Sequence, residues 1–320
     1  MDKIDKTDKS NKNVINNLNK DYKQFSFDFV GRRKIFFIII AVIFIVGMIS
    51  FFTRGFNWDI DFTGGAFMEF NLNKEVTDED EKNVESIVEE VIGFKPSSVQ
   101  KSGNPTRQIL IRTKSLDTEV RDAVFNALAD EYDLSSKDIF ISNNVDPTVG
   151  AALAKDTIIA VVSAVILMLI YITIRFDFFS GLSTILCLIH DMFVMLTFYS
   201  ILQIPMSITV IAAFLTILGY SINATIIIFD RVRENAKLKK GTGTSFSQII
   251  NESTSQTLSR SINTTVTTLV VLICVYIIGV PTIKAFVLPL MVGIIAGLFS
   301  SICVSGPLWD LIKPEKSKIK

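Results

Sequence analysis

Six long apolar runs restrict what this chain can fold into more than any other feature of its sequence. Each is long enough to cross a hydrocarbon core of about 30 Å, which takes about 20 helical residues. Charged residues make up 20% of the chain and lie mostly outside these runs, so the sequence predicts a membrane protein with an all-α bundle of six transmembrane helices. The runs cover approximately residues 35–53, 155–174, 180–201, 208–229, 262–280 and 285–306.

Lys and Arg residues in the short flanks predict the orientation of the bundle, because they are retained on the cytosolic side. They are frequent in the N-terminal tail, the loop 230–261 and the C-terminal tail, whereas the two opposite loops have only Lys284 between them. Both termini are therefore predicted to be cytosolic. A cleavable signal peptide is the alternative for the first run, but its apolar region is too long and no cleavage-site pattern follows it.

These features predict five parts of the chain. The N-terminal tail interleaves Lys with Asp and cannot bury a core, so we expect it to be disordered. The segment 245–260 is amphipathic, and we expect it to form a helix on the cytosolic membrane surface. The predicted parts are a disordered cytosolic tail (1–29), transmembrane helix 1 (30–54), an extracytoplasmic α+β domain (55–150), transmembrane helices 2–6 with the cytosolic loop 230–261 (151–312) and a cytosolic tail (313–320).

The segment 55–150 alternates between strand and helix patterns. Val76–Ile92 and Leu116–Tyr132 have helical periodicity, and the runs AFMEFNL, SSVQKSG, RQILIRT and KDIFISNNV are typical of strands. The order β-α-β-β-α-β is that of a ferredoxin-like domain. No His, Cys or nucleophile–base cluster occurs in it, so we expect no catalysis there. Asp59 and Asp61 flank one apolar residue, but two carboxylates without further oxygen ligands do not predict a metal site.

The composition argues against several classes of function. The net charge is zero, so no nucleic-acid partner is predicted. The three cysteines lie inside apolar runs, and we interpret them as small core residues rather than as disulfide or metal ligands. An intramembrane enzyme would need paired aspartates on facing helices or a His-rich metal site, and one intramembrane His beside one Asp provides neither. We therefore predict no enzymatic activity and no cofactor.

Five motifs, in order along the chain, resemble those of the SecF family of protein-export membrane proteins, within the resistance-nodulation-division superfamily. They are DFTGG after the first run, VGAALAKDT before the second, LIHDMF in the third, GYSINATIIIFDRVREN in the fourth and QTLSRSINTT at the fifth. The resemblance covers about residues 30–312. In the first motif, Asp61, Gly64 and Gly65 match the family pattern at the start of the external domain.

The resemblance implies an accessory subunit of the bacterial protein translocase in the cytoplasmic membrane. Such a subunit pairs with SecD, a similarly built six-span protein, and uses a proton or sodium gradient to draw polypeptides outward from the SecYEG channel. The partners implied are SecD, SecYEG, the translocating unfolded polypeptide and membrane lipid. Half of an ion-coupled exporter of small molecules or lipids is an alternative, but that class usually has a much longer external domain.

Polar side chains in the fourth and fifth runs predict a face that two neighbouring helices share. Lipid cannot hydrogen-bond such groups, so we expect them to line a bundle interior or a watery path. Hydrogen bonding that merely packs one helix on another is the alternative. The residues are Thr216, Tyr220 and Asn223 in the fourth run, and Arg260, Asn263, Thr264, Thr267 and Thr268 in the fifth.

Arg260 lies near the cytosolic end of the fifth run, where a simple membrane anchor is one interpretation. The resemblance implies a second one, because the family has a functional arginine at the matching position. On that basis we assign Arg260 to an ion pathway. The pathway that the resemblance implies consists of Arg260, Asp191, Asn223, Ala224, Thr225, Tyr220 and Thr264.

His190 and Asp191 lie near the middle of the third run. An aspartate at the membrane centre costs about 2.5–3.5 kcal/mol on insertion scales, so we expect it to have an interaction partner or a functional role. His is the side chain whose unperturbed pKa is nearest neutrality. A proton relay and a buried hydrogen-bonded pair that stabilises the bundle both remain open.

Ala224 is the main departure from the family pattern. The family has an aspartate here, after the Asn that Asn223 matches, and that carboxylate takes up and releases the transported ion. A methyl group cannot do this. An engineered substitution, a transfer of the role to another residue such as Asp191, and an uncoupled structural subunit are the three explanations, and the transfer is the least favoured.

Gly293 and Gly297 form a G-x-x-x-G pattern in the sixth run. Such a pattern gives a helix a face on which another helix can approach closely. Packing within the bundle and contact with SecD are both consistent with it.

Overall fold

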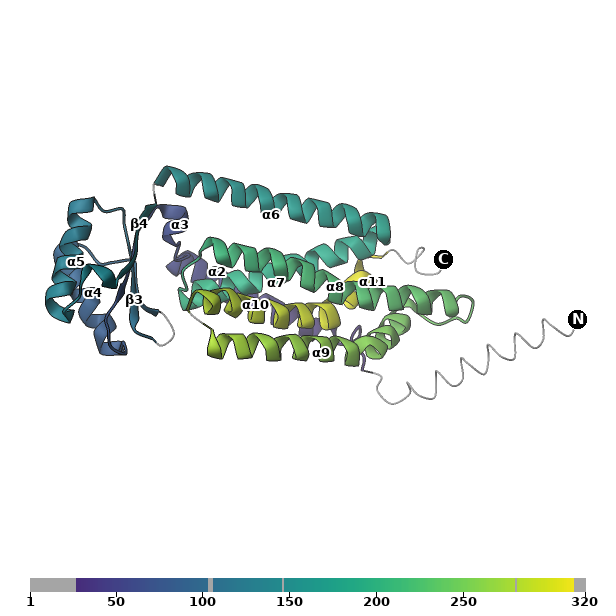
Figure 1. The fold of residues 1–320 in the computed structure, drawn as a ribbon. Helices are drawn as coiled ribbons and strands as arrows, with labels where there is room; N and C mark the ends of the chain where they lie inside the picture. Colours follow the sequence, from purple (N-terminus) through teal and green to yellow (C-terminus); the bar gives the residue numbers. More distant parts are fainter. Residues whose placement is uncertain (1–26, 103–105, 146, 280, 314–320) are drawn as a thin grey trace, which may run out of the picture.

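The computed structural model of the protein describes residues 27–102, 106–145, 147–279 and 281–313. A long bundle of helices carries a small sheet domain at one end, which we call the proximal end (Figure 1). The end of the bundle that contains α11 (Gly306–Ile312) is the opposite, distal end. Six helices are long and apolar enough to cross a membrane, as the six apolar runs predict. The expected disorder of the N-terminal tail falls almost entirely outside the described residues.

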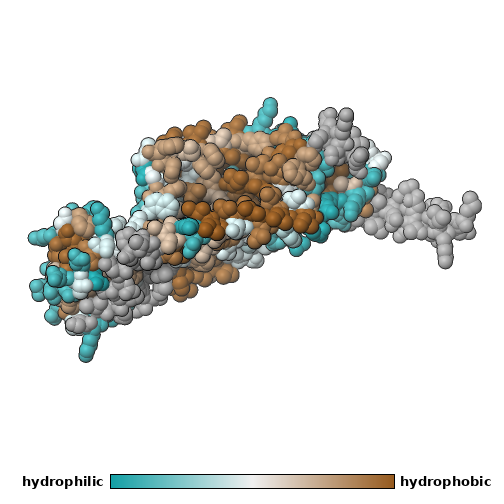
Figure 2. Space-filling model, turned by 90° about the horizontal axis from the view of Figure 1, so that it is seen from above, coloured by the Kyte–Doolittle hydropathy of each residue, from teal (hydrophilic) through white to brown (hydrophobic). Residues whose placement is uncertain are grey.

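The surface of the bundle has the distribution of polarity that a membrane requires. Figure 2 shows a broad apolar band over the helices, with hydrophilic residues at the distal end and over much of the sheet domain. The bundle consists of α2 (Arg33–Arg54), α6 (Pro147–Arg175), α7 (Phe178–Leu202), α8 (Ile208–Leu238), α9 (Phe246–Ile278), α10 (Pro281–Phe299), a π-helical segment η2 (Ser300–Ser305) and α11 (Gly306–Ile312).

The helices α8 and α9 extend farther at the distal end than the apolar runs predict. Two predictions are therefore wrong. The fourth apolar run predicts a span over 208–229, but α8 continues through the charged residues after Phe229 to Leu238. The segment 245–260 is not a separate surface helix but the first half of α9. The physical reason is that its apolar side chains, including Phe246 and Ile250, are buried in the bundle core rather than turned toward lipid.

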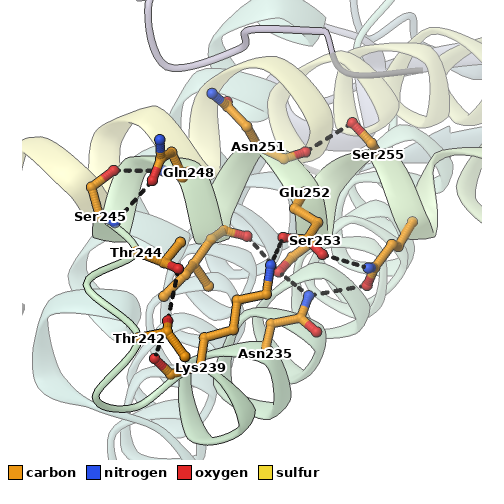
Figure 3. Close-up of polar contacts among 12 residues, drawn as sticks. Asn235, Lys239, Thr242, Thr244, Ser245, Gln248, Asn251, Glu252, Ser253 and Ser255 are labelled. Carbon is orange, nitrogen blue, oxygen red and sulfur yellow. Dashed lines mark hydrogen bonds and ion pairs between the residues drawn. The ribbon is translucent and has the colours of Figure 1, made fainter. Parts of the chain in front are cut away.

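Polar contacts hold these two extensions together as a hairpin (Figure 3). Lys239 forms an ion pair with Glu252. The Asn235 amide donates to the Ser253 hydroxyl over 2.8 Å, in a buried position. A capping box of Ser245 and Gln248 begins α9 and satisfies backbone N–H groups that would otherwise lack partners. The hairpin is thus an ordered continuation of the two helices, held by contacts between them.

The two glycines of α10 pack inside the bundle. A Cβ atom on Gly293 would lie 2.2 Å from the Ile217 side chain, and one on Gly297 would lie 3.2 Å from the Ser221 side chain. Both glycines therefore allow the backbone of α10 to approach α8 closely. Of the two interpretations of the G-x-x-x-G pattern, internal packing is the one that the structure supports.

The helix α6 is the least buried of the six spanning helices, since only 6% of its apolar membrane-spanning stretch is buried inside the protein. Its distal part contacts the bundle core through Ile172 and, just beyond its end, Phe176. At its proximal end, Gly150 lies against the backbone of α3 (Ile60–Thr63). Figure 1 shows α6 running along one side of the bundle toward the sheet domain.

The sheet domain follows the predicted order of strands and helices. It consists of β1 (Gly65–Asn71), α4 (Asp78–Ile92), β2 (Ser98–Ser102), β3 (Gln108–Thr113), α5 (Thr118–Tyr132) and β4 (Ile139–Val145). The strands form one antiparallel sheet in the order β2-β3-β1-β4. Alternate side chains of β1 and β3, such as Met68 and Ile111, are buried in a core that α4 and α5 cover. Residues 103–105, between β2 and β3, lie outside the described residues.

We expect Asp80→Asn to destabilise the sheet domain at neutral pH. Asp80 accepts from the backbone N–H of Thr77 over 2.9 Å and from Lys74 over 2.8 Å. Burial alone would raise the pKa of Asp80, but the bonds from Lys74 and Thr77 outweigh it and lower that pKa to about 2. The ionised carboxylate therefore contributes stability above the unfolded-state pKa of about 3.9, and this contribution is lost as the pH falls through about 2.

The measurement is thermal unfolding of the full chain, followed in the sheet domain at pH 6 and at pH 2. We expect a loss of about 1–2 kcal/mol for Asp80→Asn at pH 6 and a much smaller difference at pH 2. Asp122→Asn, at an exposed position on α5, is the control. An equal effect of Asp80→Asn at both pH values would contradict the assignment.

Candidate functional site

A polar seam joins α8 to α9, as the two rows of polar residues predict. The Tyr220 hydroxyl lies 3.2 Å from the backbone carbonyl of Thr264 and 3.1 Å from the Thr268 hydroxyl. The Thr264 hydroxyl donates to the carbonyl of Arg260 one turn earlier. Tyr220 and Thr264, two of the predicted pathway residues, thus contact each other directly.

In this chain by itself, most of the seam lies on the outer surface of the bundle rather than in its interior. Asn223, Thr216, Asn263 and Thr267 are exposed. Arg260 is exposed too, and within the described residues its guanidinium has no ion-pair partner. Polar groups on a lipid-facing surface are costly, so lipid contact is unfavourable for this surface.

Ala224 and Thr225 lie beside the seam on α8. Ala224 is half-buried, and Thr225 is buried with 1% of its surface exposed. The Thr225 hydroxyl has no hydrogen-bond partner among the described residues. Position 224, where the resemblance implies an aspartate, is therefore close to the exposed seam rather than in the bundle core.

Asp191 occupies a separate, buried polar cluster between α7, α8 and η2. One carboxylate oxygen lies 2.9 Å from Nδ1 of His190. The other accepts a 2.5 Å hydrogen bond from the Ser221 hydroxyl and a 2.9 Å bond from the Ser300 hydroxyl. Asp191 is 1% exposed. Both oxygens therefore have partners inside the protein, as a carboxylate at this depth requires.

The sequence analysis did not identify Ser300, which the π-helical segment brings to Asp191. A π-helix is often a single-turn bulge at a functional or strained site. In the same segment, the backbone carbonyl of Ser305 accepts a 2.7 Å hydrogen bond from the Ser183 hydroxyl of α7. The serine-rich sequence FSSICVSG within an apolar run is the signal that could have indicated this contact.

The seam and the buried cluster use neighbouring residues of α8 that point in different directions. Successive residues of a helix are turned by about 100°, so Tyr220 contacts α9 while Ser221 contacts Asp191. The structure therefore does not bring all predicted pathway residues together. It places Tyr220 and Thr264 in contact across the seam, Arg260 and Asn223 on the exposed part of the seam, and Asp191 in the core.

The DFTGG motif forms the junction between the bundle and the sheet domain. Asp59 begins α3 by accepting from the N–H of Ile60, and its Oδ1 lies 3.3 Å from Nε of Arg112 on β3. Burial raises the pKa of Asp59, although the Arg112 charge opposes this. Asp61 accepts from the first N–H of α8, at Ile208, over 3.0 Å.

The glycines of this motif are required by their backbone angles. Gly64 has a φ of 72° and Gly65 a φ of 154°, in a region that L-residues rarely adopt. A Cβ atom on Gly65 would also lie 2.3 Å from the Thr113 carbonyl oxygen. The described residues contain no group of three or more His, Cys, Asp or Glu that could hold a metal ion.

We expect Ser221→Ala to destabilise the bundle more than Thr216→Ala. The first change removes a hydrogen bond to a buried carboxylate, which is worth about 1.5–3 kcal/mol. Thr216 donates only to a carbonyl of its own helix, on the exposed surface. The measurement is the unfolding midpoint of each variant in the same detergent, and equal midpoints would show that Asp191 does not depend on Ser221.

Comparisons with known proteins agree with one another. The family described as "Protein export membrane protein SecD/SecF, C-terminal" matches residues 124–315. The chain is 37% identical to protein translocase subunit SecF of Sebaldella termitidis over 90% of this chain and 92% of that protein. It is also 37% identical to SecDF of Bacillus subtilis, of which it covers 39%. The crystal structure of SecDF from Thermus thermophilus, a translocon-associated membrane protein, has a TM-score of 0.78 and 31% identity, covering 89% of this chain and 38% of that one.

Proposed function

Since the chain belongs to the SecD/SecF family of protein-export membrane proteins, we propose that it is the SecF-type subunit of a protein translocase and that it functions together with SecD. In this proposal the two proteins assist the export of unfolded polypeptides that leave the SecYEG channel. The chain is a multi-pass membrane protein, and we propose the bacterial cytoplasmic membrane as its location. The distribution of Lys and Arg supports a cytosolic distal end and an external sheet domain.

The observation that carries the proposal is the uncovered seam of α8 and α9. An exposed Arg260 and exposed amides and hydroxyls on a membrane-facing surface require a protein surface opposite them. SecDF relatives contain more than twice the length of this chain, which supports a second unit that covers this face. We therefore propose that SecD packs against the seam.

We further propose that the sheet domain is ferredoxin-like and contacts extended polypeptide or the external domain of SecD. Its strand and helix order and its antiparallel sheet support the first point. Free strand edges can pair with an extended chain. The β2 edge is partly blocked, because the N–H of Lys101 donates to Glu81. The β4 edge, which pairs with β1 alone among the described strands, is the better candidate.

Ala224 leads us to propose that this chain couples weakly to the ion gradient. The seam provides hydrogen bonds and the Arg260 charge, but Ala224 provides no group that binds an ion. Asp191 is a poor replacement, since both of its oxygens are engaged by His190 and two serines. We propose that Asp191 stabilises the bundle and that the pathway site lacks its titrating group.

We expect the chain to depend on SecD for stability. With SecD present, the seam is covered; alone, it faces lipid or detergent, and we expect faster proteolysis of the bundle. The measurement is the half-life of the chain in cells with and without a SecD-type partner. A chain that remains monodisperse and equally resistant to protease without the partner would contradict the proposed interface.

We expect Ala224→Asp to raise gradient-dependent export. The new carboxylate would lie on α8 beside the seam, on the side of the bundle where Arg260 of α9 is exposed. The measurement is translocation of an exported protein into inverted vesicles that contain SecD, with and without dissipation of the ion gradient. Ala224→Asn, which has similar volume but cannot be charged, is the control.

Adding Arg260→Gln to Ala224→Asp should remove the gain. Full gradient dependence with Ala224 in place, unchanged by Asp191→Asn, would show that the coupling site lies elsewhere. Full activity of Arg260→Lys would indicate that Arg260 is only a membrane anchor.

A further inference from the structure

A hollow at the distal end gathers three cationic side chains from two helices. It measures about 340 Å³ and lies where the end of α6 meets the distal extension of α8. Its lining residues are Arg175, Asp230, Arg233, Glu234, Lys237 and Leu238. None of them belongs to the seam or to the Asp191 cluster, so neither site accounts for it.

Two of the cations are held in place before any ligand binds. The Arg233 guanidinium donates to the backbone carbonyl of Arg175, at the end of α6, over 3.1 Å. It also lies 5.3 Å from the ring centre of Phe176, and the Arg175 guanidinium lies 5.6 Å from the same ring centre. Phe176 is buried. Two guanidinium groups are thus fixed around one ring, despite their mutual repulsion.

The charges of the hollow are only partly compensated. Glu234 forms a 2.6 Å ion pair with Arg231. Asp230 is 3.9 Å from Arg233, which is a long contact. Within the part of the chain that the structure describes, Arg175 and Lys237 have no ion-pair partner. Three cations therefore face one carboxylate that is not engaged in a close pair, and the hollow has an excess of positive charge.

The position of the hollow along α6 and α8 is the one expected for lipid headgroups. The apolar stretch of α6 ends at Arg175 and that of α8 ends at Phe229, directly before Asp230, so both helices leave the hydrocarbon region here. Next to the hollow, Ile174 is 81% exposed and Tyr171 is 55% exposed. These side chains provide an apolar surface for acyl chains just below the cationic hollow.

From this arrangement we propose that the hollow binds the phosphate of an anionic phospholipid, with Arg175, Arg233 and Lys237 as its ligands and the outer face of α6 against the acyl chains. Basic pockets at the ends of transmembrane helices are suited to such headgroups. Arginine is suited to the phosphate because its guanidinium can donate two hydrogen bonds at once. The bound lipid would join α6 to α8 at the corner where α6 contacts the bundle core.

The test is native mass spectrometry of the purified full chain, titrated with phosphatidylglycerol, cardiolipin or phosphatidylcholine. We expect tighter binding of the two anionic lipids than of phosphatidylcholine. Near a membrane surface each cation contributes about fivefold in affinity. We therefore expect Arg175→Gln combined with Lys237→Gln to weaken binding about 25-fold. Asp230→Asn, which removes the opposing charge, should strengthen binding about fivefold.

Lys34→Gln combined with Lys240→Gln is the matched control, because both lysines are exposed at the distal end and outside the hollow. It should leave the affinity within about twofold of the parent. Unfolding of all variants without added lipid shows whether the fold is intact. Equal binding of phosphatidylcholine, an equal effect of the control pair, or displacement of the lipid by the same concentration of inorganic phosphate would each overturn the proposal.

Discussion

The hydrogen bonds of the buried Asp191 carboxylate determine how closely several elements of the bundle must pack. Buried in a membrane helix, it is tolerable only with hydrogen-bond partners from the protein itself. His190, Ser221 and Ser300 supply them from α7, α8 and η2. The close approach that this requires depends on Gly297, which faces Ser221. The glycine pattern of α10, the π-helical segment and the polar serine of α8 are thus parts of one arrangement.

The seam of α8 and α9 has the opposite character. Its residues obey the same rule that polar groups in a membrane need partners, but many of them remain exposed in this chain. One face of α8 therefore has its polar groups satisfied within the fold, and the other has exposed polar groups that the proposed partner would cover. Tyr220 and Ser221, adjacent in sequence, stand on either side of that division.

Hydropathy and periodicity predicted the six spans and the order of elements in the sheet domain, because both depend on local patterns of apolar residues. They did not predict the distal extensions of α8 and α9, since these are held by contacts such as Asn235 with Ser253 rather than by lipid. The partners of Asp191 were also missed in part. Ser300 is more than 100 positions away along the chain, and only the folded bundle brings the two together. The exposure of the seam depends on how all the helices pack and on the proposed partner, and local sequence patterns contain neither.

The helix α8 is held at both of its ends. Asp61 of the junction binds its first backbone N–H, while Arg112 of the sheet holds the neighbouring Asp59. At the far end, Asn235 and Lys239 tie it to α9. Its 31 residues form a rod of about 46 Å, with Ala224 near the midpoint. Because α8 is one continuous helix attached at both ends, Ala224 lies about midway between the junction with the sheet domain and the distal hairpin.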